Sequence, residues 1–314
     1  MLNIFNKVRN GSIANRCLAL FEFPVLSRDY STKSENKKKT LATIRSKYHS
    51  KKPISVITAY DYTSARLSDE AGFDVLLVGD SLGMLHLGYD TTTKVTMAEM
   101  LMHCKSVSRT SKHAFLIGDM PFGSYLTMEE AVQNACVFIK EGGMHAVKLE
   151  GGERIADKVS SIVDAGILVM GHIGLTPQTE IALGGYKVQG TTAKGALQLL
   201  KEAISLQNSG CFSIVLECIP EKIAMEITNT IDIPTIGIGA GRYTNGQVQT
   251  FHDTIGLYDL IKPKFAKPYI NTEQNISIAL KSFRTEIQDN TFPSKEHTFK
   301  IKEKIYQEFL NKKS

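Results

Sequence analysis

The stretch VLLVGDS, residues 75–81, is a short apolar run that ends on polar residues. Five further runs have this form: AFLIGDMP at 114–121, AVKLEGG at 146–152, ILVMGHIG at 167–174, SIVLECIP at 213–220 and TIGIGAG at 235–241. Such runs are typical of the buried strands of a parallel barrel, in which functional side chains lie where the strands end. We therefore expect one shared pocket, formed by Asp80, Asp119, Lys148, Glu150, His172 and Glu217.

Segments with helical patterns lie between these runs. Two of them, 96–108 and 127–141, begin with Thr-x-x-Glu, the sequence of a capping box. Further helices are expected at 40–48, 60–71, 153–165, 192–208 and 221–230, with a first strand at 54–58 and a weakly marked eighth strand at 247–251. Alternating helices and short strands are what right-handed βαβ crossovers require. The pattern predicts an α/β fold, a (βα)8 TIM barrel in a single domain at residues 31–314, with the helix at 40–48 closing its floor.

Composition excludes several classes of protein. The chain has 314 residues, of which 42% are hydrophobic, enough for the core of one barrel. It carries 37 basic and 32 acidic residues without an arginine-rich stretch, so no nucleic-acid partner is expected. No apolar run reaches the roughly 18 residues of a membrane span. The five cysteines form no C-x-x-C pair, and we expect reduced thiols that fill core space.

Residues 1–30 differ from the rest of the chain. They contain four basic residues against two acidic ones, and apolar residues alternate with the basic ones. Such an amphipathic leader is typical of mitochondrial targeting, and RDYS at 28–31 has the form of an arginine-directed cleavage site. We expect a mitochondrial protein whose mature chain begins near Ser31, with an untargeted tail as the alternative.

Lys148 and Glu150 are two residues apart on one expected strand, so their side chains point to the same face. An internal salt bridge that stabilises the barrel is one interpretation. Asp80 and Asp119 also end strands, however, and several carboxylates beside one lysine would repel each other without a cation. Mg²⁺ suits this set better than Ca²⁺, because it uses few carboxylates and keeps waters. Zn²⁺ would require more histidines than His172.

A magnesium ion among carboxylates indicates a reaction class. An ion chelated by a 2-oxo acid polarises the carbonyl and stabilises the enolate that forms when a base removes the adjacent C–H proton. Glu217 is the carboxylate left for this task, and an apolar surrounding makes a carboxylate a stronger base. We expect Glu217 to be the catalytic base. A structural Glu217, held by a backbone cap or a lysine, is the alternative.

Seven strings of the sequence carry a resemblance to a known family. They are ITAYDYTSARLSDEAGFDVLLVGDSLGM, GDMPFGSY, HAVKLEGGE, GHIGLTPQ, GGYKVQG, VLECIP and IPTIGIGAG. In this order, between Ile57 and Phe299, the chain closely resembles the ketopantoate hydroxymethyltransferases of pantothenate biosynthesis. The resemblance implies a (βα)8 barrel that binds Mg²⁺ and transfers a hydroxymethyl unit from 5,10-methylenetetrahydrofolate to 3-methyl-2-oxobutanoate, giving 2-dehydropantoate. It also implies a homo-oligomer, commonly a decamer.

The same resemblance implies roles for individual residues. Substrate contacts fall to Asp80, Ser81, Asp119, Lys148 and His172, metal ligation to Asp80, Asp119 and Glu150, and proton abstraction to Glu217. Two other functions are alternatives. One is a different Mg²⁺-dependent, enolate-forming barrel enzyme, such as a carbon–carbon lyase of the isocitrate lyase and phosphoenolpyruvate mutase type. The other is an inactive barrel that only binds metabolites or proteins, although no carboxylate is replaced here.

Three further segments allow weaker predictions. Gly237-x-Gly239-x-Gly241 favours a tight turn at the barrel mouth over a dinucleotide loop, because the rest of the dinucleotide fingerprint is missing. The stretch GGYKVQG at 184–190 is either a lid over the pocket or a static loop. In the tail, Ile301, Ile305 and Phe309 recur at four-residue intervals and predict a short amphipathic helix, docked on a neighbouring subunit or solvated.

Overall fold

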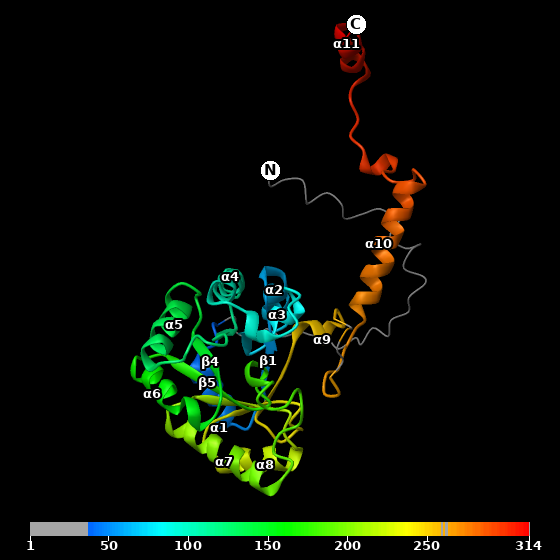
Figure 1. The fold of residues 1–314 in the computed structure, drawn as a ribbon. Coiled ribbons are helices and arrows are strands. Elements are labelled where there is room, and N and C mark those ends of the chain that lie inside the picture. Colours follow the sequence, from blue (N-terminus) through cyan, green and yellow to red (C-terminus); the bar gives the residue numbers. More distant parts are fainter. Residues whose placement is uncertain (1–36, 259, 261–262, 314) are drawn as a thin grey trace. The chain divides into compact units, whose positions relative to one another are not determined.

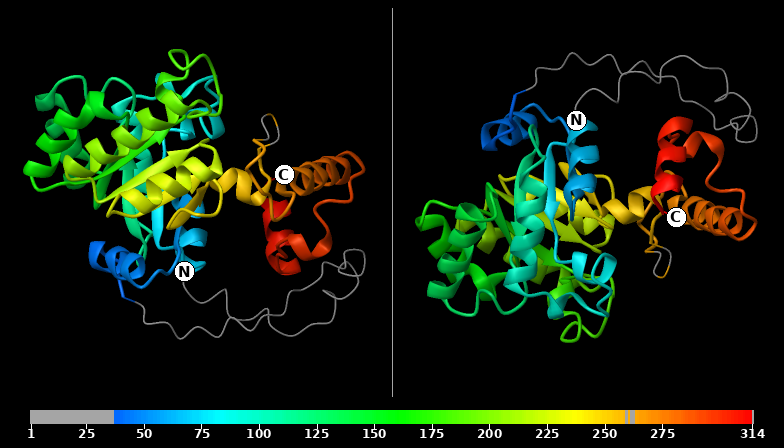
Figure 2. Two further views of the ribbon diagram at one scale, coloured as in Figure 1. Left: turned by 90° about the horizontal axis from the view of Figure 1, so that it is seen from below. Right: turned by 90° about the horizontal axis from the view of Figure 1, so that it is seen from above.

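Eight parallel strands close into a barrel in the order of the sequence, with helices around them (Figures 1 and 2). The computed structural model describes residues 37–258, 260 and 263–313, so the predicted leader at 1–30 and Cys17 lie outside the described residues. The strands are β1 Ile54–Thr58, β2 Val75–Val78, β3 Phe115–Asp119, β4 Ala146–Glu150, β5 Leu168–Gly174, β6 Ser213–Glu217, β7 Thr235–Ile238 and β8 Gly246–Gln249. β1 pairs with β8, which closes the sheet and confirms the (βα)8 fold.

All helices predicted before and between the strands are present. They are α1 Leu41–His49, α2 Tyr62–Glu70, α4 Met97–Ser108, α5 Met128–Lys140, α6 Ala156–Asp164, α7 Ala193–Asn208 and α8 Glu221–Thr230, with a short α3 at Leu82–Leu85. Both predicted capping boxes form. The Thr96 hydroxyl accepts a hydrogen bond of 3.2 Å from the Glu99 backbone N–H, and the Glu99 carboxylate accepts one of 2.8 Å from the Thr96 backbone N–H. Thr127 and Glu130 repeat this exchange.

The eighth strand differs from its predicted range of 247–251. It begins one residue earlier, at Gly246, and ends at Gln249. The chain leaves the sheet at Thr250 because this residue caps helix α9 (Phe251–Ile255), accepting a hydrogen bond from the Asp253 backbone N–H. The last two residues of the predicted strand therefore belong to a helix start.

Alternation of side chains along each strand divides the barrel interior into an apolar lower part and a polar mouth. One buried cluster contains alternate residues of neighbouring strands, among them Val75, Phe115, Ala146 and Met170. Ile44 of α1 belongs to the same cluster, which confirms that this helix closes the barrel floor. The next inward positions along β3, β4, β5 and β6 are polar: Asp119, Lys148, Glu150, His172 and Glu217. A second cluster packs the strands against the surrounding helices.

Two helices follow α9 near the C-terminus, α10 Thr272–Gln288 and α11 Glu303–Lys313. The predicted tail helix is thus confirmed as α11, whereas α10 was not predicted. Neither helix has a buried residue. The four described cysteines are free thiols, two of them, Cys104 and Cys211, buried as predicted. Among the described helices, none has the length and apolarity needed to cross a bilayer.

Candidate active site

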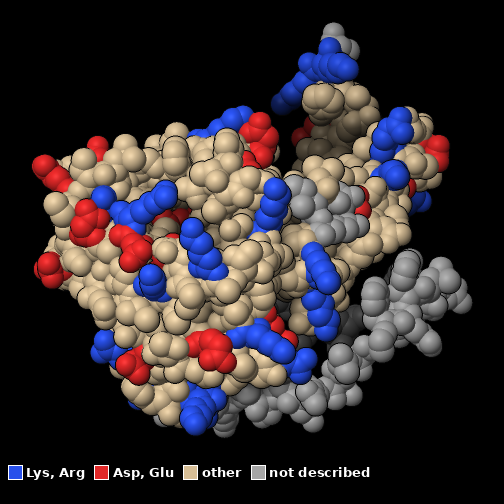
Figure 3. Space-filling model, turned by 60° about the horizontal axis from the view of Figure 1, so that its bottom comes forward, with Lys and Arg blue, Asp and Glu red and all other residues tan. Residues whose placement is uncertain are grey.

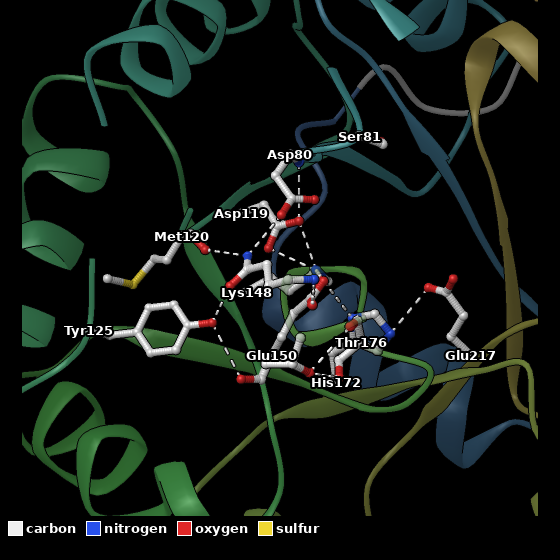
Figure 4. A network of polar contacts seen from close by, with 12 residues as sticks. Asp80, Ser81, Asp119, Met120, Tyr125, Lys148, Glu150, His172, Thr176 and Glu217 are labelled. Atoms are coloured by element: carbon white, nitrogen blue, oxygen red, sulfur yellow. Dashed lines mark hydrogen bonds and ion pairs between the residues drawn. The ribbon is translucent and has the colours of Figure 1, made fainter. Parts of the chain in front are cut away.

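The register of the barrel places the predicted polar residues side by side. Asp119 of β3 lies opposite Lys148 of β4, and Glu150 lies opposite His172 of β5. The Lys148 ammonium donates hydrogen bonds of 2.8 and 2.7 Å to the two oxygens of Asp119 and one of 3.1 Å to Oε1 of Glu150. Figure 4 shows these side chains converging, with Asp80 beside Asp119. The predicted charged pair is thus part of a larger buried network.

Three carboxylates form a compact acidic group. Oxygen atoms of Asp80, Asp119 and Glu150 lie within 4.8 Å of one another. The three residues are only 4%, 1% and 4% exposed. Burial, followed by the charges of Asp119 and Glu150, raises the pKa of Asp80 well above its usual range. A cation among these oxygens would offset both the burial of the carboxylates and the repulsion between them. The group therefore has the donor set and the charge of a divalent metal site.

Lys148 is the cation that this group already contains. Burial lowers its pKa, but Asp119, Glu150 and Asp80 together raise it above the usual value, so the side chain is an ammonium. The same network lowers the pKa of Glu150 to about 2: burial opposes this, and Lys148 and His172 outweigh burial. The salt bridge that the sequence suggested between Lys148 and Glu150 is therefore present. One ammonium still faces three carboxylates, which leaves the acidic group short of positive charge.

His172 connects this group to Glu217. Its Nδ1 lies 3.2 Å from Oε1 of Glu150, and its Nε2 lies 3.2 Å from Oε2 of Glu217 (Figure 4). Burial and Lys148 lower the pKa of His172, but the two carboxylates raise it to about 9, so both ring nitrogens are protonated at neutral pH. The Glu217 side chain is 15% exposed. Within the described residues, its charged partner is His172 and not the lysine of the alternative interpretation.

Ser81 lies at the same mouth, directly after Asp80. Its hydroxyl is 2.8 Å from the hydroxyl of Tyr60, which is fully buried. Both Ser81 and Asp80 line one pocket of about 500 Å³ together with Asp119, Lys148, Glu150, His172 and Glu217. All residues predicted for the site are therefore brought into a single cavity. Apolar side chains of the strands, such as Val215 and Ile238, form much of its remaining wall.

Gln178 was not predicted, although it links two of the carboxylates. It lies in a short 3-10 helix after β5, η4 Pro177–Thr179. Its backbone N–H donates to Oε2 of Glu150 at 3.0 Å, and its Nε2 donates to Oδ2 of Asp80 at 2.8 Å and to the carbonyl of Met120 at 2.9 Å. Tyr125 donates to its Oε1. The only sequence signal was its position in the string GHIGLTPQ, which ends at this residue.

Two loops complete the mouth. The glycine run after β7 forms a tight turn, as predicted, because Gly239 and Gly241 have φ angles of 63° and 79° that favour glycine. The stretch 184–190 contributes Tyr186, Lys187 and Val188 to the pocket wall. Its end is held by a hydrogen bond of 2.9 Å from the Gln189 backbone N–H to the carbonyl of Cys218. Whether this stretch is a lid stays a prediction.

Comparison with known proteins adds the family. Several curated bacterial proteins named 3-methyl-2-oxobutanoate hydroxymethyltransferase are similar to this chain. The protein of Heliobacterium modesticaldum is 52% identical over 264 residues, 84% of this chain and 96% of that protein. The protein of Carboxydothermus hydrogenoformans is 50% identical over 272 residues, 85% of this chain and 99% of that protein.

Solved structures confirm the fold at much lower identity. A phosphonopyruvate hydrolase matches with a TM-score of 0.56 and 12% identity, covering 88% of this chain and 96% of that chain. A 2,3-dimethylmalate lyase of the PEP mutase/isocitrate lyase superfamily matches with a TM-score of 0.55 and 15% identity, covering 83% and 92%. Identities this low show a common barrel and do not favour the alternative lyase function.

The sequence profile of the ketopantoate hydroxymethyltransferases matches residues 38–295, which include every residue of the pocket described above. This match and identities near 50% over almost the whole length of the relatives are far more specific than the shared barrel. The chain belongs to the ketopantoate hydroxymethyltransferase family and is a hydroxymethyltransferase.

Proposed function

We propose that the protein transfers the one-carbon unit of 5,10-methylenetetrahydrofolate to C3 of 3-methyl-2-oxobutanoate, with water supplying the hydroxyl oxygen, to give 2-dehydropantoate. The observation that carries this proposal is the placement of Glu217 beside a buried group of three carboxylates in one pocket. A metal-binding group beside a carboxylate that is not one of its ligands suits the deprotonation of a carbon acid.

Mg²⁺ is the ion that we propose for the carboxylate group. Asp80 and Asp119 would hold it directly. Glu150, whose oxygens face Lys148, His172 and the Gln178 backbone N–H, would contact the ion through a water, and Asp119 would keep its contacts with Lys148 beside the ion. When bound, Mg²⁺ would supply Lewis-acid polarisation of the keto carbonyl of the oxo acid.

Three side chains of the pocket would act on the oxo acid itself. Lys148 places an ammonium among the carboxylates, where it can face the negatively charged oxygens of the substrate. The Ser81 hydroxyl can donate a hydrogen bond to the same oxygens while accepting one from Tyr60. Glu217 would remove the C3 proton, which gives the enolate that attacks the methylene carbon of the folate.

His172 would orient the base. Its contacts with Glu150 and Glu217 fix the ring between the metal-binding group and the catalytic carboxylate. The protonated ring would donate from Nδ1 to Glu150 and place its charge beside Oε2 of Glu217, which leaves the other Glu217 oxygen for the substrate proton. This is a supporting role near the reacting carbons.

The decisive assay measures 2-dehydropantoate formation by the purified protein from both substrates with added Mg²⁺. Product should require the oxo acid, the folate and the metal. Product that forms at full rate in excess chelator would overturn the metal assignment. Turnover of the oxo acid without folate would instead favour a carbon–carbon lyase.

Mitochondrial import by residues 1–30 is a separate part of the proposal. Its support is the composition of residues 1–30 alone. The relatives are bacterial, and the family profile begins only at residue 38. Residues 1–30 fused to a fluorescent protein should direct it to mitochondria, and the mature protein should begin near Ser31. A diffuse signal of the fusion in the cytosol would contradict this.

A homo-oligomer is the assembly that we propose. Helices α10 and α11 expose large apolar side chains, including Phe283, Ile287, Ile305 and Phe309, which are 48%, 49%, 50% and 55% exposed. Apolar surface of this kind is typical of subunit contacts. On the face drawn in Figure 3, basic and acidic side chains are interspersed. Sedimentation analysis of the purified protein should show a symmetric assembly, up to a decamer, and a monomer would contradict it.

A further inference from the structure

The pocket is larger than the oxo acid needs. Its volume is about 500 Å³. 3-Methyl-2-oxobutanoate has eight non-hydrogen atoms, and even at the ~30 Å³ that a water molecule occupies in the liquid they would fill about 240 Å³. About half of the pocket is therefore left for another molecule, and this space is continuous with the carboxylate group.

Charge is distributed unevenly along this pocket. Its wall contains five carboxylates, which are the three of the metal group, Glu217 and Asp253. Two exposed lysines, Lys187 and Lys264, belong to the outer part of the wall. Neither has an acidic partner within 4 Å among the described residues of the chain. Lys148 and His172 are already paired with carboxylates of the wall, so a further anionic group would find unpaired positive charge only at the edge of the pocket.

Each of the two lysines is next in sequence to an aromatic residue of the pocket wall. Tyr186 precedes Lys187, and its hydroxyl lies 3.6 Å from the sulfur of Met84. Phe265 follows Lys264, and its ring lies over Gly239 after β7, where an added Cβ would be 2.8 Å from the ring. These four residues, Tyr186, Lys187, Lys264 and Phe265, are called the donor lip below. They combine flat apolar surface with positive charge.

We propose that the donor lip binds the folate co-substrate in one orientation, an inference that rests on the proposed function. The ring system and its methylene carbon enter the pocket toward Glu217, and the carboxylates of the glutamyl part stay outside, paired with Lys187 and Lys264. Aromatic side chains of the lip face the rings of the folate. The reverse orientation would place the two glutamyl carboxylates among the acidic residues of the wall, whose cations, Lys148 and His172, are already paired.

The test removes each lysine and, separately, the negative charges of the carboxylates that the lysines are proposed to bind. Lys187→Ala, Lys264→Ala and the double variant are assayed with 5,10-methylenetetrahydrofolate and with its glutamyl bis-amide, which lacks those charges. With the natural donor, each substitution should raise KM for the folate by about twofold to fivefold, as expected for exposed ion pairs, and the double variant by about the product. With the bis-amide, the substitutions should have almost no effect. Lys201→Ala, an exposed lysine of α7 away from the pocket, is the matched control.

Exchange of the C3 proton of the oxo acid with solvent needs no folate, so it reports separately on the inner half of the pocket. It is measured for every variant and distinguishes damage to the oxo acid site from loss of donor binding. A KM for the folate that is unchanged in the double variant, or raised equally with both donors, would overturn the donor lip. If the wild-type protein shows no metal-dependent exchange, the proposed function is wrong, and the inference that rests on it is wrong as well.

Discussion

The side-chain amide of Gln178 donates a hydrogen bond of 2.8 Å to Oδ2 of Asp80, so one oxygen of a predicted metal ligand is already occupied by the protein. The orientation of the amide is determined, because Nε2 also donates to the Met120 carbonyl, which can only accept. Oδ1 of Asp80 is therefore the oxygen available to a metal. Gln178 thus fixes the orientation of the Asp80 carboxylate.

Gln178→Leu should weaken magnesium binding. Leucine cannot donate to Asp80, which would leave that carboxylate free to rotate, and loss of such a contact to a metal ligand typically costs about 10-fold to 100-fold in metal affinity. Isothermal titration of the metal-free protein with Mg²⁺ measures the change. Gln133→Leu, an exposed glutamine of α5, is the control and should bind Mg²⁺ like the wild type. Equal affinity of the two variants would show that Gln178 does not position Asp80.

His172 should make the stability of the metal-free protein depend on pH. Its pKa is about 9 in the folded protein, against 6.5 when unfolded, so the stabilisation is fully present below pH 6.5 and is lost as the pH rises through 9. The difference corresponds to about 3 kcal/mol at most. Urea unfolding of the wild type and His172→Gln in excess chelator, between pH 6 and pH 10, gives the difference in stability directly. A difference that stays constant over this range would contradict the charged ring.

Most of the site could be predicted because it lies on strands. Along a strand, alternate residues share a face, so Lys148 and Glu150 had to point the same way. The parallel register then brings the ends of neighbouring strands together, and Asp119 and His172 join the same pocket. Neither step needs information beyond the sequence and the geometry of a barrel.

Other parts could not be predicted from local pattern. Gln178 lies in the loop after β5, and its contact with Asp80, 98 positions earlier, depends on how that loop returns over the mouth. Loops have no periodicity from which such a contact follows. Strand β8 has only four residues, and two of them are glutamines, so its apolar signal is weak.

Asp69 should contribute to stability and not to catalysis. This buried residue of α2 accepts hydrogen bonds from the backbone N–H groups of Lys112, His113 and Ala114 and from the Ser111 hydroxyl. Burial raises its pKa, but these bonds outweigh burial and lower it below 3.8, so the stabilisation is present above that pH and lost as the pH falls. Asp69→Asn should reduce the free energy of unfolding by about 2–4 kcal/mol in urea at pH 7.

The control for this prediction is Asp157→Asn, at an exposed aspartate of α6. This substitution should leave the free energy of unfolding almost unchanged. The catalytic constants of folded Asp69→Asn should equal those of the wild type, because Asp69 does not line the pocket. A stability within about 0.5 kcal/mol of the wild type would mean that the amide replaces the carboxylate in these contacts.

Glu217→Gln should abolish proton abstraction while leaving the metal site intact. The amide cannot accept the C3 proton as a carboxylate does, and loss of a general base typically costs about 10²-fold to 10⁴-fold. NMR in D₂O, with oxo acid and Mg²⁺ but without folate, follows the exchange of the C3 proton. Titration with Mg²⁺ and the oxo acid should give nearly wild-type affinities, because glutamine keeps the size of the side chain. Glu226→Gln, on the exposed side of α8, serves as the control. Rapid exchange in Glu217→Gln would assign the base to another residue of the pocket.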